Sequence, residues 1–434
     1  MLAVFQQEKD ARPGMSLPLS VSPVAASVGN SNDQSRRHNL SAILSMLHRD
    51  GPQSRATLTR NSGLNRSTIA ALVLELGSLG LVFETEAADS GSVGRPSPVV
   101  HANSRVAVIA VNPDVDAVMV AIVGLGGMLH RRIRFPTSST PTVQETVDIV
   151  AEIVAGLRPG LDSDFRILGV GVAVPGLVES GSSRVILAPH LGWRDVALAE
   201  MMAAVLGYPV HVANDASLGA IAESTFGAGR AVKDLVYLNG SPSGIGGGVL
   251  SGGSLIRGSR GFASELGHTL VNSVGVKCHC GKTGCLETEV NLDSLLAAIG
   301  SSGIDLDDLD AMLDASGHEP VVQAEIDRQL DILGTAIGSF ISVFDPEAFV
   351  LGGFLSSLYR ANPQRLLDRV RLASFGELGA EIRIEPAQLG SRVLMIGAAE
   401  LALADTIANP AAIGVVAVAA RGGIAQQHPS LETE

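Results

Sequence analysis

The three cysteines of this 434-residue chain, Cys278, Cys280 and Cys285, lie within eight residues of one another. His268 stands ten positions before the first of them. Three thiolates and one imidazole are the ligand set of a closed, tetrahedral structural zinc site, and two glycines among them permit a tight loop. The alternative is a group of buried, reduced cysteines that serve only as small core residues. The short spacing favours Zn2+, the one cofactor that we expect.

The same segment contains two longer patterns, G-x-x-x-E-x-G-H ending at His268 and C-x-C-G-x-x-G-C-x-E ending at Glu287. Together they resemble the zinc-binding core of the ROK family (repressors, open reading frames and sugar kinases). The resemblance implies that His268 and the three cysteines hold the metal, and that Glu265 and Glu287 bind sugar hydroxyls, with His268 able to serve both. A carboxylate suits this role because it accepts hydrogen bonds from a vicinal diol. Taken alone, either glutamate would be interpreted as a solvated surface charge.

The chain is longer than a sugar kinase of this type needs, which indicates an additional domain. Residues 36 to 100 carry a net charge of +2, whereas the residues after 100 carry −14. A mildly basic module ahead of an acidic body is typical of a DNA-binding head on an effector domain. Residues 1 to 35 show no periodicity and predict a disordered tail.

The basic module has the pattern of three helices. Apolar residues repeat at helical spacing from Arg36 to about residue 50, Ser54 is an N-cap candidate for a short helix ending near Leu58, and a third helix opens at residues 64 to 68. Residues 80 to 83 predict a strand, and the Gly- and Ser-rich stretch from 90 to 96 predicts a wing. The alternative for residues 36 to 100 is a helical oligomerisation module.

This stretch resembles the winged helix-turn-helix of ROK repressors, through S-R-x-x-L-x-x-x-S-G-L-x-x-S-T from Ser54 to Thr68. The resemblance implies double-stranded operator DNA as a partner, with the start of the third helix in the major groove and Arg95 in an adjacent minor groove. Arg36, Arg37 and Arg60 are further phosphate candidates. The predicted DNA-binding residues are Arg55, Asn65, Arg66, Ser67, Thr68 and Arg95.

The body opens with two β-rich runs, 106 to 112 and 117 to 123, as do the lobes of the actin-like sugar kinase fold that the family shares. In the family's kinases the turn between them reads D-x-G-G-T and approaches the phosphates of ATP. Here it reads Asn112-Pro113-Asp114-Val115-Asp116. Both glycines are absent, the proline lacks an N–H, and the two aspartates would repel a polyphosphate. We therefore predict that the protein is not an enzyme.

Other family loops are retained and imply further sugar-binding residues. Gly176 ends a buried strand, and Asn214 and Asp215 end another that leads into a helix. In the family's kinases the aspartate at this place is the general base, so Asp215 is a vestigial base candidate. Simple N-capping is the alternative for the Asn-Asp pair. The glycine-rich stretch from 241 to 248 resembles a second phosphate loop, although such a hairpin also occurs without a ligand. The predicted sugar-binding residues are Gly176, Asn214, Asp215, Glu265, His268 and Glu287.

The predicted fold is a winged helix-turn-helix followed by a two-lobed α/β actin-like domain with a structural zinc loop. The predicted boundaries are 1–35 for the tail, 36–100 for the head, 101–229 with 391–406 for the first lobe, 230–390 for the second lobe and 407–434 for a C-terminal tail. An extended linker is expected near 97 to 105.

The predicted function is that of a sugar-responsive transcriptional regulator, a repressor of carbohydrate uptake or catabolism genes. Its effector would be a sugar or sugar phosphate, and a homodimer or dimer of dimers would bind an inverted-repeat operator. The alternatives are an ATP-dependent sugar kinase with a fused DNA-binding head and a regulator controlled by a protein partner. The sequence lacks a long apolar run and a signal-peptide pattern, so we expect a cytoplasmic protein without membrane partners.

Overall fold

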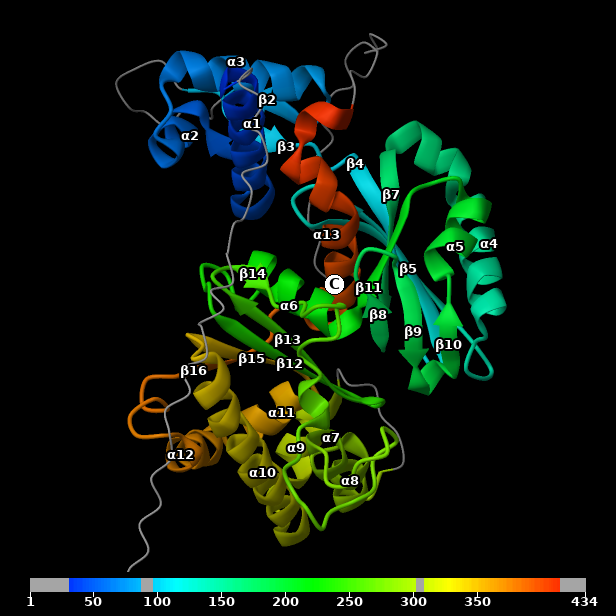
Figure 1. Ribbon diagram of the computed structural model, residues 1–434, viewed down its shortest axis with the longest axis vertical. Coiled ribbons are helices and arrows are strands. Elements are labelled where there is room, and N and C mark those ends of the chain that lie inside the picture. Colours follow the sequence, from blue (N-terminus) through cyan, green and yellow to red (C-terminus); the bar gives the residue numbers. More distant parts are fainter. Residues whose placement is uncertain (1–30, 87–96, 302–307, 414–434) are drawn as a thin grey trace, which may run out of the picture.

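The computed structural model describes residues 31–86, 97–301 and 308–413. These residues form a small, mainly helical head above a body of two lobes, each built on a five-stranded sheet (Figure 1). In the described part of the chain, no helix is long and apolar enough to cross a membrane.

The head contains three helices and a three-stranded sheet of order β1-β3-β2. Its elements are α1 (Ser31–Asp50), β1 (Gln53–Ser54), α2 (Arg55–Ser62), α3 (Arg66–Ser78), β2 (Val82–Thr85) and β3 (Val99–Ala102).

Local capping sets the bounds of the second and third helices. Ser54 caps α2 as predicted, because its Oγ accepts a hydrogen bond from the Thr57 backbone N at 3.1 Å. The prediction that α2 ends near Leu58 is wrong: the helix continues to Ser62. Gly63 then ends it in the left-handed conformation, with φ of 70°, which glycine adopts without steric cost.

The first helix begins earlier than predicted. α1 starts at Ser31, inside the segment expected to be a disordered tail. Asp33 lies in its first turn and pairs with Arg37 at 2.8 Å and Arg36 at 3.3 Å, and a negative charge at this end of a helix is favourable. Residues 1–30 lie outside the described part, as do residues 87–96, which include the predicted wing turn and Arg95.

The predicted linker between head and body is also wrong in part. Residues 99–102 form β3, which pairs with both β1 and β2, so the predicted boundary at residue 100 falls inside a strand of the head. Asn103 then donates from Nδ2 to the Gly80 carbonyl oxygen at 2.8 Å. The chain therefore leaves the head only just before β4 (Val106–Pro113) begins.

The first lobe is a mixed sheet of order β11-β7-β4-β5-β6, with a small second sheet of order β10-β9-β8. Helices α4 and α5 cover one face of the large sheet. Its remaining elements are β5 (Ala117–Gly124), β6 (Met128–Pro136), α4 (Val143–Asp164), β7 (Arg166–Val174), β8 (Leu177–Glu179), β9 (Arg184–Ala188), η1 (Pro189–Leu191), β10 (Trp193–Val196), α5 (Leu198–Leu206), β11 (Val210–Asn214) and α6 (Asp215–Phe226).

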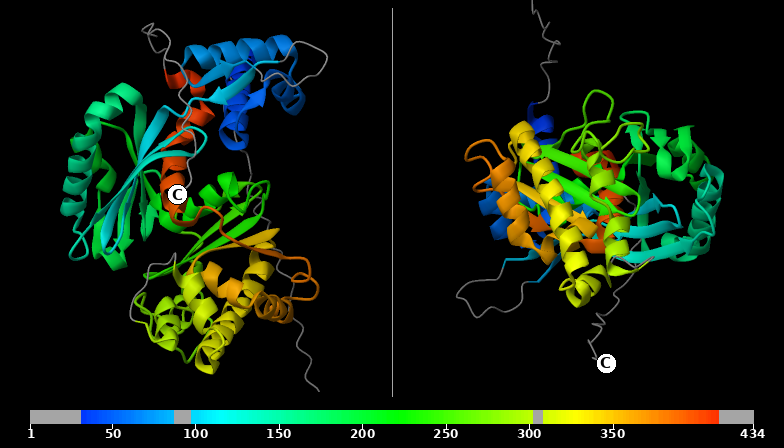
Figure 2. Two further views of the ribbon diagram at one scale, coloured as in Figure 1. Left: turned by 180° about the vertical axis from the view of Figure 1, so that it is seen from behind. Right: turned by 90° about the horizontal axis from the view of Figure 1, so that it is seen from below.

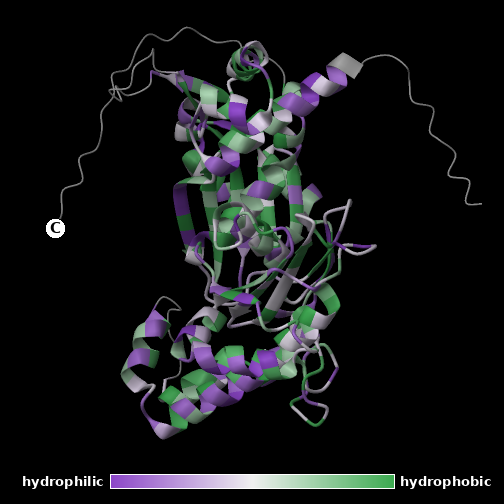
Figure 3. Ribbon diagram, turned by 90° about the vertical axis from the view of Figure 1, so that its left-hand side faces the viewer, coloured by the Kyte–Doolittle hydropathy of each residue, from purple (hydrophilic) through white to green (hydrophobic). Residues whose placement is uncertain are grey.

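The second lobe has a sheet of order β14-β13-β12-β15-β16, covered on its outer face by helices. These helices alternate polar and apolar colours in Figure 3, as amphipathic helices do. Its elements are β12 (Leu235–Ser241), β13 (Gly244–Ser251), β14 (Ser254–Leu255), η2 (Leu266–His268), α7 (Leu286–Glu289), α8 (Leu292–Ile299), α9 (Leu309–Ser316), α10 (Pro320–Phe344), β15 (Ala348–Gly353), α11 (Phe354–Ala361), α12 (Pro363–Ala373), β16 (Arg383–Pro386) and η4 (Gly390–Arg392).

Two helices lie between the sheets of the lobes. α6 packs on β12 and β13 of the second lobe, and α13 (Val393–Ala408) packs on β4 and β7 of the first lobe and on α6 (Figure 2). The contact between the helices is close, because a Cβ on Gly397 would lie 2.4 Å from the Leu218 carbonyl oxygen. α13 thus connects the last part of the chain to the first lobe.

The head and the first lobe share one hydrophobic core. Buried residues of α1, such as Leu44 and Leu47, belong to the same cluster as Met395 and Leu403 of α13. The predicted C-terminal tail from residue 407 also contributes here: η5 (Pro410–Ile413) follows α13, and the Ile413 carbonyl oxygen accepts from Arg166 Nη2 at 3.1 Å. Residues 414–434 lie outside the described part.

Candidate functional site

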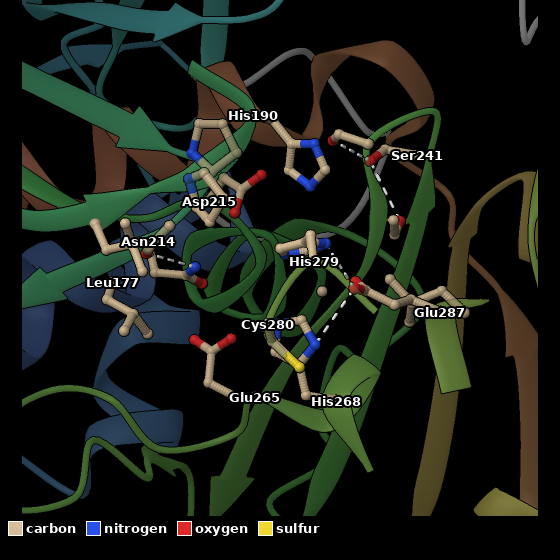
Figure 4. A pocket seen from close by; sticks show the side chains of 18 of the residues that line it. Leu177, His190, Asn214, Asp215, Ser241, Glu265, His268, His279, Cys280 and Glu287 are labelled. Carbon is tan, nitrogen blue, oxygen red and sulfur yellow. Dashed lines mark hydrogen bonds and ion pairs between the residues drawn. The ribbon is translucent and has the colours of Figure 1, made fainter. Parts of the chain in front are cut away.

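A pocket of about 660 Å³ lies between the two lobes. The six predicted sugar-binding residues all line it, and they come from both lobes: Gly176, Asn214, Asp215, Glu265, His268 and Glu287. Figure 4 shows most of these side chains facing the same space. The tertiary structure therefore brings the predicted residues together, while sugar binding itself stays a prediction.

The wall from the first lobe is built where β11 passes into α6. Asn214 caps α6, with its Oδ1 accepting from the Ser217 backbone N at 2.8 Å, and its Nδ2 donates to the Gly176 carbonyl oxygen at 3.1 Å. The capping alternative is thus present, and the same amide also fixes the loop at Gly176. Asp215 follows as the first residue of the helix.

The pKa of Asp215 is raised to about 7, mainly by burial and to a smaller extent by the nearby charges of Asp114 and Glu265, against the opposing effect of the hydrogen bond that its Oδ1 accepts from the Ala216 backbone N. A carboxyl group of this pKa exchanges its proton near neutral pH. It can therefore donate or accept a hydrogen bond from a hydroxyl in the pocket.

The turn between β4 and β5 lies near this wall. Asp114 donates its backbone N–H to the Ala117 carbonyl oxygen at 2.8 Å, so that N–H is used inside the turn. Pro113 has no N–H to offer. Burial raises the pKa of the Asp114 carboxyl, an effect that Asp116 increases and that Arg134 and His190 oppose. The turn thus carries two carboxyl groups, and neither Pro113 nor the bonded Asp114 N–H offers a donor to an anion.

The predicted metal ligands are close together in the second lobe. The ligand atoms of His268, Cys278, Cys280 and Cys285 all lie within 4.8 Å of one another, with Cys280 Sγ and Cys285 Sγ at 3.6 Å and Cys278 Sγ and His268 Nδ1 at 3.7 Å. A tetrahedral zinc ion with bonds of about 2.0 to 2.3 Å has ligands about 3.3 to 3.8 Å apart. The four residues fit such an ion.

The backbone of this loop depends on glycine. Gly284 has φ of 72°, and a Cβ there would lie 1.5 Å from the Asn272 carbonyl oxygen. Gly281 has φ of 92° with open space around it. Both predicted turn glycines therefore adopt the left-handed conformation, but only Gly284 is also closely packed.

The hairpin between β12 and β13 closes the pocket beside the metal loop. Ser241 Oγ lies 2.8 Å from Ser243 Oγ, and both residues line the pocket. Gly244 packs directly against Glu287, since a Cβ on Gly244 would lie 2.5 Å from Glu287 Oε2. Glycine at position 244 of this hairpin thus allows close packing against the carboxylate of Glu287, a predicted sugar-binding residue.

Two histidines of the pocket were not predicted. His190 of η1 and His279 of the metal loop face each other from opposite lobes, with ring centroids 4.8 Å apart and nearly perpendicular rings. His279 could have been noticed from its position between two of the cysteines. His190 lies in η1 of the first lobe, and its pairing with His279 depends on how the lobes meet.

Four of the six predicted DNA-binding residues, Asn65 to Thr68, lie at the start of α3. Asn65 caps the helix, and its Oδ1 accepts from the Thr68 backbone N at 2.8 Å and from Ser67 Oγ at 2.7 Å. Arg66 is exposed and forms no ion pair with any described residue. Asn65 is therefore occupied with the helix itself, whereas the Arg66 guanidinium is free to reach a ligand.

Other arginines of the head are held by carboxylates. Arg55 pairs with Glu84 through two hydrogen bonds of 2.5 Å, which ties α2 to β2. Arg36 likewise pairs with Glu75, at 2.6 and 2.9 Å, which ties α1 to α3. In the structure these two side chains stabilise the head, so contact with a phosphate would require them to leave or share their partners.

Comparison with known proteins gives three relevant similarities. The model of the ROK family matches residues 108–405. The xylose repressor of Bacillus subtilis is 25% identical over 370 residues, which cover 85% of this chain and 95% of the repressor. The glucokinase of Streptomyces coelicolor is 31% identical over 292 residues, which cover 62% of this chain and 89% of the glucokinase.

A solved structure of a regulator is also similar to this chain. The crystal structure of a ROK family transcriptional regulator, described as a homolog of the E. coli MLC protein, has a TM-score of 0.71 and 25% identity to this chain. The match covers 87% of this chain and 98% of that regulator.

Proposed function

Because the chain belongs to the ROK family, we propose that it is a sugar-responsive DNA-binding repressor of transcription. The observation that carries this proposal is the extent of the similarities. The xylose repressor aligns with 85% of the chain and the glucokinase with only 62%. The family model begins at residue 108, so the head lies outside the part that the kinases share.

The sugar effector would bind in the pocket between the lobes. Asp215, Glu265 and Glu287 place carboxylates on both sides of this space, and carboxylates accept hydrogen bonds from vicinal hydroxyls. The thiolates and His268 would hold a structural zinc ion, which would fix the loop that carries Glu287. A sugar that contacts both lobes would favour one arrangement of the lobes over others.

The effect of sugar binding would be transmitted to the DNA-binding head through the hydrophobic core that the head shares with the body. α6 begins at Asp215 in the pocket wall and packs against α13, which contacts α1 of the head. A change in lobe orientation would therefore move the head as a packed unit. In a homodimer, two heads that bind an inverted-repeat operator would change their spacing, which alters affinity for DNA. The target genes would be those of carbohydrate uptake or catabolism.

A sugar kinase with a fused head is the competing function. The 31% identity to a glucokinase favours it, and a pKa near 7 would suit Asp215 as a general base. The turn from Asn112 to Asp116 argues against it, because this turn lacks the glycines of a phosphate loop, Pro113 has no N–H, and the N–H groups of Asp114 and Val115 are already bonded within the turn. We infer that Asp215 only forms hydrogen bonds with the effector.

The test is fluorescence anisotropy of the full chain on DNA from the intergenic region beside its gene, with scrambled DNA of equal length as the control. A panel of neutral sugars and sugar phosphates is then titrated. Specific binding that one sugar alters supports the proposal. Specific binding that no sugar alters favours a protein partner as the signal. Transfer of phosphate from ATP to a hexose would instead support the kinase.

A further inference from the structure

Glu287 is almost buried, with 9% of the residue exposed, and three polar side chains converge on one of its oxygens. Its Oε1 lies 3.0 Å from Cys278 Sγ, 3.2 Å from His279 Nδ1 and 3.3 Å from His268 Nδ1 (Figure 4 shows the two histidine contacts). A buried carboxylate that faces one thiol and two imidazoles has the donor types of a metal site.

Most separations among these four groups are close to those of a tetrahedral ion. Cys278 Sγ lies 3.7 Å from His268 Nδ1 and 3.8 Å from His279 Nδ1. With the three contacts of Glu287, five of the six separations are therefore between 3.0 and 3.8 Å, and all lie within 4.8 Å. An ion with bonds of about 2.0 to 2.3 Å requires separations of about 3.3 to 3.8 Å.

We infer that the loop offers a second metal position, formed by His268, Cys278, His279 and Glu287. It shares His268 and Cys278 with the predicted thiolate position, and His279 and Glu287 take the places of Cys280 and Cys285. Because two ligands are shared, one ion occupies one position at a time. The second position uses a single thiolate and puts its carboxylate ligand on the wall of the pocket.

The two positions differ in the number of bound thiolates, and Co2+ reports this number. The intensity of the thiolate-to-metal charge-transfer absorption grows with each coordinated sulfur. The full chain loaded with Co2+ should therefore show the intensity of three bound thiolates, here called the three-thiolate spectrum, when the thiolate position is occupied. Cys280→Ser removes a ligand of that position alone. His279→Ala removes a ligand of the second position alone. Cys280 and His279 are both exposed, so neither substitution disturbs the core.

We expect Cys280→Ser to bind one Co2+ per chain with the charge-transfer intensity reduced to about a third, as one thiolate replaces three. Adding His279→Ala should then weaken Co2+ binding at least tenfold, and Glu287→Gln should do the same. His279→Ala alone should keep the three-thiolate spectrum. Circular dichroism checks that each variant is folded.

Two results would overturn the second position. One is a Cys280→Ser protein whose spectrum shows two thiolates, because Cys285 would then still bind the ion. The other is an unchanged Co2+ affinity when His279→Ala is added to Cys280→Ser. Neither metal position requires DNA or a sugar, so these results are independent of the proposed repressor function.

Discussion

His48 donates a hydrogen bond from Nε2 to Glu400 Oε1 across 2.8 Å, although 352 positions separate the two residues in the chain. Nδ1 of the same ring accepts from the Gly126 backbone N at 2.9 Å, so the proton of the neutral imidazole is on Nε2. His48 is only 2% exposed. Its ring also packs edge-on against Phe226, with centroids 5.2 Å apart. One side chain of the head thus contacts α13, the β5–β6 turn and the end of α6.

Replacing His48 should separate the head from the body. In His48→Ala the Gly126 N–H and the Glu400 carboxylate lose their partner in a buried place, which we expect to cost about 2 to 4 kcal/mol. Calorimetry should then show the head unfolding at a lower temperature than the lobes. Glu400→Gln is the matched control, because its amide oxygen still accepts from Nε2 and the expected loss is below about 1 kcal/mol. Equal effects of the two substitutions would argue against this interpretation.

Arg66→Ala should weaken specific DNA binding. Under the proposed function its unpaired guanidinium reads a base at the start of α3, and losing such a contact costs about 1 to 3 kcal/mol and relaxes specificity at one position. Anisotropy titrations with the operator and with single-base variants measure both effects. Arg371→Ala, an exposed arginine of the second lobe, should leave the affinity unchanged. Normal operator binding by Arg66→Ala would remove this residue from the interface.

Gly284→Ala should damage the metal loop far more than Gly281→Ala. Both residues have positive φ, but only at Gly284 would the new Cβ meet a backbone oxygen, that of Asn272. The shared backbone strain costs about 1 to 2 kcal/mol in each variant, and the clash is added only at Gly284. Zinc content per chain, measured by mass spectrometry after purification, should fall strongly in Gly284→Ala alone. Similar zinc contents in the two variants would contradict the packing argument.

Asp215→Asn should stabilise the protein, and only above acidic pH. An unfolded aspartate has a pKa of 3.8, whereas burial raises that of Asp215 to about 7 in the folded chain. Between these values the unfolded state has already lost its proton, so stability falls as the pH rises from about 4 to about 7 and stays reduced above it. Removing the carboxylate should therefore add up to about 4 kcal/mol at pH 8 and almost nothing at pH 4.

Urea unfolding of both proteins at several pH values measures this difference. Asp116→Asn serves as the control, because Asp116 lies on the β4–β5 turn with an exposed side chain. A stabilisation by Asp215→Asn that is the same at all pH values would show that burial of the charge is not its cause.

Much of the local structure could be predicted because its causes are local. Ser54 caps α2, and the glycines of the metal loop take positive φ, as their sequence positions indicate. Two of the bounds that failed depended on partners elsewhere in the chain. β3 is a strand because β1 and β2 pair with it, and η5 is held by Arg166, far away in the chain.

The sequence by itself determined the predicted ligand set of the metal loop and the helix-turn-helix of the head. Both depend on residues that are close in the chain, and a short loop or turn keeps such residues close in space. Only the tertiary structure decided which distant groups share a site. It paired His190 with His279 across the lobes, Arg55 with Glu84 and His48 with Glu400. These contacts depend on how whole sheets and helices pack, and burial between packed elements also sets the pKa of Asp215. The spacing of residues along the chain does not predict that packing directly.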